Sequence, residues 1–370
     1  MLESDESGTD WTVPDPESVG LDPEALAEAV AYAKAHETPP EQVAYDFSNT
    51  HPWEGDGPLG GALGAMPDRR GGPAGVVLFR GTPVVEWGDT RRVDHTFSVA
   101  KTFLSLLAGL AWDRGLIEEL SDPVSEYVDD GGFDTEQNRT ITWEHLLHGT
   151  SEWEGTLFDR PDSVDRNRPV GREADELGDR GERSLREPGT YWEYNDVRIN
   201  RLALSLLRLW EKPLPRVLAH ELMDPIGATR WEWHGYYNSH VMVNGTRMRS
   251  VSGGGHWGGG LWIAARDLAR VGQLLLDRGE WDGNRLLSPS YIDWMTEPCP
   301  IESGYGGLVW LNTQNRWESV PESSYAALGY GRNVLWIDPE HELVAVARWL
   351  ESDDERSHVD GFLRRLLEAV

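Results

Sequence analysis

The stretch HTFSVAKTFLSLLAGLAWDRG (residues 95–115) marks the point where the chain changes from strand-like to helical periodicity. Its apolar residues cover most of the circumference of a predicted helix, which indicates a buried helix from Ser98 to near Gly115. The residues of that surface are Phe103, Leu104, Leu106, Leu107, Leu110 and Ala111. Lys101, one of only three lysines in a chain that has 31 arginines, stands at the start of this apolar run.

Ser98 and Lys101 are three residues apart, so on a helix they lie on the same face and can form a hydrogen bond. A serine hydroxyl is a weak nucleophile unless a base takes its proton. Lysine can do so when burial or a positive neighbour lowers its pKa. A helix beginning at Ser98 would also favour negative charge on a substrate oxygen near its N-terminus. The alternative is that Ser98 is only an N-cap, because Ser-x-x-Lys arises by chance in about one such chain in six.

The composition predicts a folded chain with a strongly acidic surface. Its 370 residues are 39% hydrophobic with 18 tryptophans, enough for one large domain or two tightly packed ones. A formal net charge of −29 would oppose compaction at low salt, whereas molar salt shortens the Debye length to roughly 3 Å. We therefore expect a cytoplasmic protein of a halophilic organism. The alternative is an acidic surface that binds a basic partner.

Other classes of protein are disfavoured by the sequence. No Lys/Arg cluster stands clear of acidic residues, which argues against nucleic-acid binding. A single cysteine, Cys299, excludes an intramolecular disulfide, and no apolar run is long enough to span a membrane. The acidic N-terminus lacks the apolar core of a signal peptide. The oligomeric state cannot be predicted.

The order of predicted elements favours an α+β fold. Residues 1–15 form a flexible acidic arm, and residues 22–36 an amphipathic helix capped by Asp22. Residues 74–89 contain a hairpin that turns at residues 80–83, and residues 258–279 contain a further long helix. The remaining predicted elements are helices at 142–149, 199–210 and 358–370 and strands at 305–312, 332–338 and 342–350.

We therefore expect one antiparallel sheet built from both ends of the chain and flanked by helices, with an inserted helical domain. The sheet domain would comprise residues 16–115 and 241–370. The helical domain would comprise residues 116–240, with a polar loop at about 160–188.

Ser-x-x-Lys is also the nucleophile motif of serine β-lactamases and penicillin-binding proteins. The chain resembles that superfamily over most of its length, and most closely its class C-like branch of esterases, D-aminopeptidases and 6-aminohexanoate-dimer hydrolases. The segments that carry the resemblance are FSVAKTF (97–103), GLIEELSDPVSEYV (115–128), TWEHLLHGTSEWEG (142–155), PGTYWEYNDVRINRLALSLL (188–207), GGGLWIAARDLARVGQLLLDRG (258–279), PCPIESGYGGLVWLNT (298–313) and YAALGYGRNVLWIDPEHELVAVARW (325–349).

The resemblance implies roles for individual residues. Ser98 would be the acylating nucleophile and Lys101 its proton acceptor. Tyr194 matches the catalytic tyrosine of the Tyr-x-Asn motif, which carries a proton to the leaving group. The alternative for Tyr194 is a packing role. The backbone N–H groups of Ser98 and Tyr330 would bind the oxyanion. Among the tryptophans, which more often serve packing, Trp153 and Trp257 stand beside motif segments and are candidates for the pocket.

Two positions depart from the family pattern. Asp196 stands where Tyr-x-Asn has its asparagine, and a carboxylate there would favour a charged Lys101 if the two are close; otherwise Asp196 serves packing. The third motif, Lys-Thr-Gly in β-lactamases, reads Ala-Leu-Gly and ends at Gly329. Arg332 could replace the missing lysine, or it is a surface arginine.

The sequence thus predicts a serine hydrolase that forms an acyl-enzyme with a small ester or linear amide. The missing lysine of the third motif argues against an efficient β-lactamase, and a cell-wall peptidase would need an export signal. A non-catalytic binding protein with the same fold remains an alternative, which Asp196 and Ala327 favour. No cofactor or metal is predicted, because His-Glu-x-x-His and Cys/His clusters are missing from the sequence. His145 and His148 are expected to pack or cap locally.

Overall fold

The main sheet is antiparallel and draws its strands from both ends of the chain. The computed structural model describes residues 11–41, 43, 54–56, 70–167, 183–236, 238–253, 260–351 and 357–370. The six strands run in the order β13-β14-β15-β16-β2-β3. They are β2 (Gly75–Phe79), β3 (Thr82–Trp87), β13 (Trp310–Leu311), β14 (Tyr325–Gly329), β15 (Asn333–Asp338) and β16 (Leu343–Ala347). This topology confirms the predicted α+β fold.

The β2–β3 hairpin turns where the sequence predicted it. Arg80 and Gly81 both have positive φ, 50° and 76°, as a tight two-residue hairpin turn requires. Thr82 and Pro83, which the prediction assigned to the turn, already belong to β3.

Helices cover both faces of this sheet. On one face, α1 (Pro23–Ala35) and α9 (Ser357–Leu367) pack together against alternate strand residues such as Val77 and Ala345. On the other face, α7 (Ala265–Leu276) packs against the intervening residues, among them Val76 and Val344. The period-two alternation of strand side chains thus divides the core into two layers. Asp22 caps α1 as predicted, accepting hydrogen bonds from the N–H groups of Glu24 and Ala25.

A second, four-stranded sheet connects the main sheet to the nucleophile segment. Its order is β1-β7-β10-β4, formed by β1 (Glu54–Asp56), β4 (Val93–His95), β7 (Trp231–Gly235) and β10 (Leu261–Ala264). The predicted long helix within residues 258–279 is α7, and the strand β10 before it was not predicted. Leu261–Ala264 pairs with β4 on one side and β7 on the other, and α7 begins only at Ala265. Pairing on both sides decides the structure of a short apolar run that periodicity alone cannot assign.

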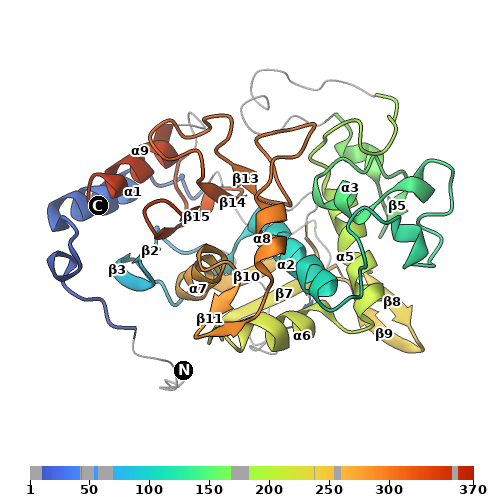
Figure 1. Cartoon of the computed structure of the whole chain (residues 1–370), viewed down its shortest axis with the longest axis horizontal. Helices are drawn as coiled ribbons and strands as arrows, with labels where there is room; N and C mark the ends of the chain where they lie inside the picture. Colours follow the sequence, from blue (N-terminus) through green and yellow to red (C-terminus); the bar gives the residue numbers. More distant parts are fainter. Residues whose placement is uncertain are drawn as a thin grey trace.

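The nucleophile helix α2 (Ala100–Asp113) lies in the middle of the molecule (Figure 1). It follows a 3₁₀ turn, Phe97–Val99, so the α-helix itself begins two residues after Ser98. All residues of α2 from Ala100 to Ala111 are buried, as the apolar run predicted. Its predicted end near Gly115 is also confirmed.

The central part of the chain is mainly helical and lies beside α2, on the right in Figure 1. It contains α3 (Trp143–Leu147), α5 (Asp196–Trp210) and α6 (Leu214–Leu218), and α5 packs directly against α2. Residues 116–240 also include strand β7. The division into domains remains a proposal. Of the predicted acidic arm, residues 1–10 lie outside the described residues, as do residues 168–182 of the predicted polar loop.

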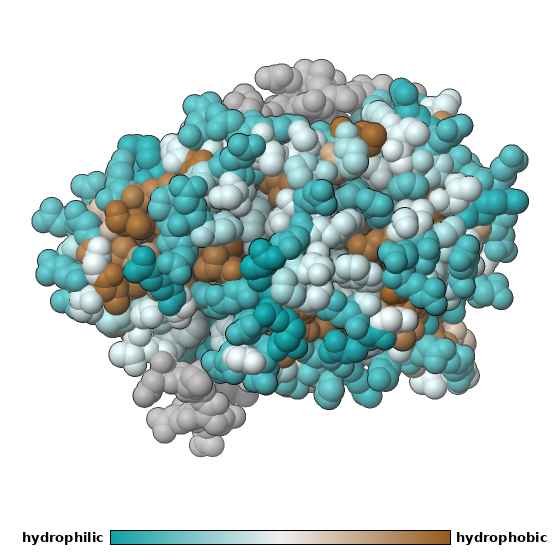
Figure 2. All heavy atoms as spheres, in the orientation of Figure 1, coloured by the Kyte–Doolittle hydropathy of each residue, from teal (hydrophilic) through white to brown (hydrophobic). Residues whose placement is uncertain are grey.

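The remaining elements are short. They are α8 (Pro289–Met295), the hairpins β5 (Thr156–Leu157) with β6 (Arg160–Pro161), β8 (His240–Val243) with β9 (Thr246–Arg249) and β11 (Glu280–Trp281) with β12 (Asn284–Arg285), five 3₁₀ turns (Pro16–Val19, Phe97–Val99, Val124–Glu126, Asn138–Thr140, Asp162–Asp165) and a π-helical turn, Ala219–Met223. Polar residues cover most of the face seen in Figure 2, and apolar residues form small separate groups. Within the described ranges, the helices are too short or too polar to cross a bilayer.

Candidate active site

Ser98 is held at the surface of an otherwise buried segment. It is partly exposed, whereas every other residue from Val93 to Ala111 is buried. Thr96 fixes the chain just before it, because its N–H and its hydroxyl both donate to the carbonyl of Leu261 on β10, each at 2.9 Å. Phe97 then adopts φ 52°, an uncommon conformation for a bulky residue. The sharp bend into the 3₁₀ turn thus exposes the Ser98 hydroxyl at the start of α2.

Lys101 lies beneath Ser98 and is almost completely buried, with 2% of its surface exposed. Its Nζ donates to Ser98 Oγ at 2.8 Å and lies 2.8 Å from Asp196 Oδ1. Nζ is also 4.5 Å from the centroid of the Tyr194 ring. Burial lowers the pKa of Lys101, but Asp196 and Tyr194 raise it more strongly, so the net pKa is above its ordinary value. The structure therefore brings together four of the candidate residues: Ser98, Lys101, Tyr194 and Asp196.

Tyr194 and Asp196 reach this site from the N-terminal end of α5. Asn195 is the N-cap of that helix: its side chain accepts from the N–H of Arg198 and donates to the carbonyl of Asp162 at 2.9 Å. Asp196, the first helical residue, donates its N–H to Asp165 Oδ2 at 3.0 Å. The turn Asp162–Asp165 thus anchors the end of α5, and Asp196 does not point away into packing.

An arginine–carboxylate network lies directly behind this end of α5. We define it as Glu152, Asp162, Glu193, Arg166, Arg183 and Arg198. Arg198 is central: it lies 2.7 Å from Glu152, 3.0 Å from Glu193 and 3.3 Å from Asp162. Burial raises the pKa of Glu152, but Arg183 and Arg198 lower it more, so the net pKa is low. The network fixes the backbone on both sides of Tyr194.

The third-motif segment runs against the nucleophile turn. A Cβ on Gly329, at the end of β14, would lie only 2.0 Å from the carbonyl oxygen of Thr96, so this close approach requires glycine. Beyond it, the side chain of Asn333 donates to the carbonyl of Tyr330 at 3.0 Å and in turn accepts from Arg348. These contacts fix the backbone of Tyr330, whose side chain is 61% exposed. Arg332 lies half-buried in the same turn.

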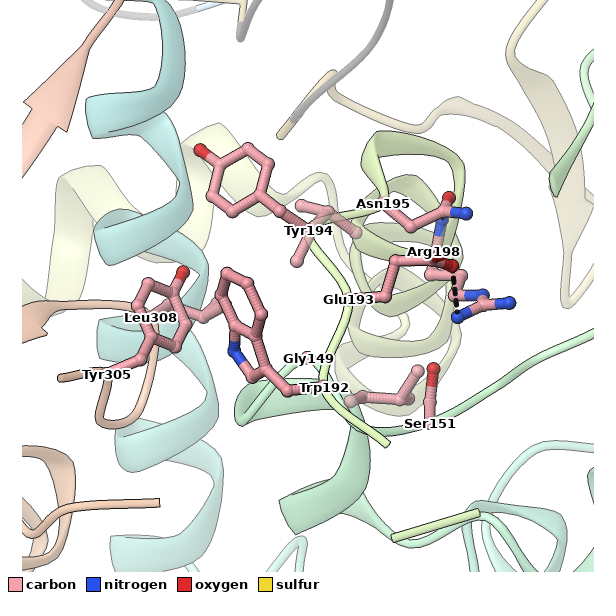
Figure 3. Close-up of a pocket in the computed structure, with 11 residues that line it drawn as sticks. Gly149, Ser151, Trp192, Glu193, Tyr194, Asn195, Arg198, Tyr305 and Leu308 are labelled. Atoms are coloured by element: carbon pink, nitrogen blue, oxygen red, sulfur yellow. Dashed lines mark hydrogen bonds and ion pairs between the residues drawn. The ribbon is translucent and has the colours of Figure 1, made fainter. Parts of the chain in front are cut away.

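An aromatic cluster adjoins Tyr194. Trp310 stacks on the Tyr194 ring with centroids 5.9 Å apart, and Tyr305 packs edge-on against Trp310 at 4.9 Å. Trp192 packs edge-on against Tyr305 at 5.5 Å. Figure 3 shows Trp192, Tyr194 and Tyr305 around a small cavity about the size of one water molecule. Trp192, Tyr194 and Trp310 remain partly exposed.

Of the two tryptophans chosen from the sequence, the structure describes only Trp153. Trp153 is buried, its indole N–H donates to the carbonyl of Gly132 at 2.7 Å, and it does not line the cavity. Trp257 lies outside the described residues. Tyr305 and Trp310 were not predicted from the sequence, and Trp192 was expected only to pack. The signal available for Trp192 was its position two residues before Tyr194.

The two histidines near the site have local packing roles, as predicted. The N–H of Thr142 donates to His145 Nδ1, which helps cap α3. His148 stacks on Trp294 with centroids 4.9 Å apart, and burial together with His145 lowers its pKa to about 4. In the part of the chain that the structure describes, no three His, Cys, Asp or Glu side chains are grouped so that they could hold a metal ion.

The fold is that of the β-lactamase and penicillin-binding class. Residues 73–367 match the model of the Beta-lactamase family, and the chain belongs to that family.

Three similar proteins illustrate the range of relatives. The 6-aminohexanoate-dimer hydrolase of Paenarthrobacter ureafaciens is 27% identical over 123 residues, which cover 29% of this chain and 30% of that protein. A penicillin-binding protein homologue from Caulobacter crescentus has a TM-score of 0.63 at 14% identity, covering 95% of this chain and 99% of its own. EstCE1, a hydrolase with promiscuous acyltransferase activity, has a TM-score of 0.55 at 14% identity, covering 92% and 98%. The structural likenesses establish the fold.

Proposed function

We propose that the protein is a serine hydrolase that forms an acyl-enzyme at Ser98 with a small ester or a linear amide. One observation carries the proposal: the hydroxyl of Ser98, partly exposed in a buried segment, lies 2.8 Å from the Nζ of a buried lysine. A lysine that is buried beside a serine at the surface can exchange a proton with that serine, the nucleophile. A fully exposed lysine and serine would not do so.

The mechanism follows from these positions. Ser98 Oγ attacks the substrate carbonyl while its proton passes to the unprotonated amine of Lys101. Tyr194, whose ring lies beside Lys101 Nζ, carries a proton to the leaving group. The backbone N–H groups of Ser98 and Tyr330 stabilise the oxyanion, and Gly329 permits the close approach that this requires. Water then attacks the acyl-enzyme by the reverse proton path and releases the acid.

The side chains that form one wall of the site support the proposed substrate class. Trp192, Tyr194 and Trp310 offer aromatic surface for an apolar group near the scissile bond. The third motif lacks the lysine that holds a β-lactam carboxylate, which favours substrates without that group. The name of the Paenarthrobacter relative denotes action on an amide, and EstCE1 is described as transferring acyl groups. Both chemistries pass through attack on a carbonyl.

The test is turnover of p-nitrophenyl esters and short p-nitroanilide amides by wild type and two variants. Ser98→Ala should abolish hydrolysis while leaving the circular-dichroism spectrum unchanged. Ser105→Ala is the matched control, since Ser105 is a buried serine on the helix α2 that follows Ser98, and its hydroxyl bonds to Tyr291. Equal loss in both variants, or turnover that survives Ser98→Ala, would reject the assignment. A folded wild type without any hydrolysis would favour a non-catalytic binding protein.

We also propose that the protein works in the salt-loaded cytoplasm of a halophile. The support is the net charge of −29 and the predominance of polar residues on the face seen in Figure 2. Self-repulsion should weaken as the Debye length falls from about 10 Å at 0.1 M salt to about 3 Å at 1 M. The thermal midpoint should therefore rise steadily with KCl over this range. A midpoint that is constant or falls would argue against the proposal.

A further inference from the structure

Asp196 occupies the place at which the family resemblance leads one to expect an asparagine. We infer that Asp196 is a positioning residue that holds Lys101 as an ammonium ion in the resting enzyme, so that turnover rises with pH. The inference rests on the proposed function, because it concerns the group that takes the proton of Ser98.

The contacts of Lys101 are those of a cation. Its Nζ lies 2.8 Å from the hydroxyl of Ser98 and 2.8 Å from a carboxylate oxygen of Asp196. An ammonium group has three hydrogens to donate and no lone pair to accept with. The side chains of Lys101 and Asp196 are only 2% and 5% exposed, so water screens their attraction weakly. An asparagine at this place could accept a hydrogen bond but would carry no compensating charge.

Several other titratable groups surround the pair formed by Lys101 and Asp196. Tyr194 flanks Lys101, and Tyr305 and Tyr236 approach from the segments before β13 and after β7. Burial raises the pKa of Tyr236 to about 12 and that of Tyr305 well above its ordinary value, so both phenols stay neutral at neutral pH. Asp165, in the turn Asp162–Asp165, accepts a hydrogen bond from the N–H of Asp196. A second carboxylate therefore lies near the Lys101–Asp196 pair.

This protonation state limits the first chemical step. When Ser98 Oγ forms its bond to the substrate carbonyl, the Ser98 O–H bond breaks and the proton must form a new N–H bond on Lys101. Only enzyme with an unprotonated Lys101 can accept it, and Asp196 makes that fraction small at neutral pH. The fraction, and with it kcat/KM, rises as the pH approaches the pKa of Lys101. Asp196→Asn removes the charge that favours the ammonium form.

The chain allows Lys101 to be observed directly, because it has only three lysines and both others, Lys34 and Lys212, are exposed. Protein labelled with ¹³C at lysine Cε gives three NMR signals, which Lys34→Arg and Lys212→Arg variants assign. In wild type, Lys101 should titrate with a pKa above the ordinary value of a lysine. In Asp196→Asn its midpoint should fall by about one pH unit or more. The rise of kcat/KM with pH should move down by the same amount.

The matched control is Asp267→Asn, which neutralises a buried carboxylate on α7 that accepts from the N–H groups of Thr229 and Arg230. It should leave both the Lys101 signal and the pH profile unchanged. A wild-type Lys101 that titrates at or below the ordinary pKa of a lysine would overturn the inference without any variant. So would an Asp196→Asn profile that coincides with wild type. Neither result touches the proposed function, which is tested separately by the loss of hydrolysis in Ser98→Ala.

Discussion

Two buried charge assemblies meet at the N-terminal end of α5, and they use different cations. On one side, Lys101 pairs with Asp196 beneath the exposed hydroxyl of Ser98. On the other side, the arginine–carboxylate network surrounds Arg198. Arginine stays charged at any physiological pH and binds carboxylates with a rigid fork, whereas a buried lysine can lose its proton. In the proposed mechanism, the rare lysine therefore stands where a proton moves, whereas arginine stands where a charge stays fixed.

Replacing Lys101 by arginine and Arg198 by lysine should give the largest difference between the two roles, proton transfer and fixed charge. Lys101→Arg keeps a positive charge but cannot accept a proton, so kcat/KM should fall by about 10²- to 10⁴-fold. Arg198→Lys keeps a charge in the network and should retain most turnover while lowering stability. Steady-state kinetics and urea unfolding on both variants measure the two effects. Comparable turnover in Lys101→Arg and wild type would show that Lys101 acts only as a fixed charge.

Removing Arg198, the central arginine of the network, should show how much stability is lost when buried carboxylates lack a partner. Arg198→Met leaves Glu152, Glu193 and Asp162 with fewer partners, and the free energy of unfolding should fall by about 3–5 kcal/mol. Arg364→Met is the control, because Arg364 pairs with Glu368 on the exposed side of α9 and should cost at most about 0.5 kcal/mol. Urea unfolding gives both values. Equal losses would mean that burial of the network contributes little.

His148 adds a buried group that must stay neutral. Its pKa is about 4 in the folded protein against 6.5 in the unfolded chain, so the unfolded chain binds more protons between these values. The stability that it contributes is complete above about pH 6.5 and is lost as the pH falls toward 4, by up to about 3 kcal/mol.

His148→Phe, which can still stack on Trp294, should reduce this loss in urea unfolding at pH 7 and pH 4. The exposed His220→Gln is the comparison variant and should behave like wild type. If His148→Phe loses as much stability between pH 7 and pH 4 as wild type does, other groups cause the loss.

The aromatic cluster should give the smallest effect. Trp310→Ala removes the ring that stacks on Tyr194 and should lower kcat/KM for an aromatic ester by about two- to tenfold, equivalent to about 0.5–1.5 kcal/mol. The effect should shrink for an acetyl ester that cannot reach the wall. Trp281→Ala, in the hairpin of β11 and β12, should change neither rate. Equal losses for both esters would place the cluster outside the substrate site.

Local patterns carried much of the prediction. Ser98 and Lys101 are three residues apart, and Tyr194 and Asp196 belong to one motif, so short-range spacing and resemblance were enough to select them. The N-cap Asp22 and the hairpin turn at Arg80–Gly81 are equally local features.

Contacts between residues that are far apart in the sequence could not be predicted from such local patterns. Arg198 contacts Glu152 and Asp162, 46 and 36 residues away, and no periodicity marks such partners. Leu261–Ala264 became a strand because two distant strands pair with it. Trp153 and Trp310 look alike in sequence, and only tertiary packing determines that the first is in the core and the second beside Tyr194.

The most direct test of the central claim is to locate the activated nucleophile. Wild type, Ser98→Ala and Lys101→Ala would be incubated with a fluorophosphonate probe in molar KCl and analysed by intact-mass spectrometry and peptide mapping. We predict a single adduct on Ser98 in wild type that is lost in both variants. An adduct on another residue, or a folded wild type that stays unlabelled, would contradict the account.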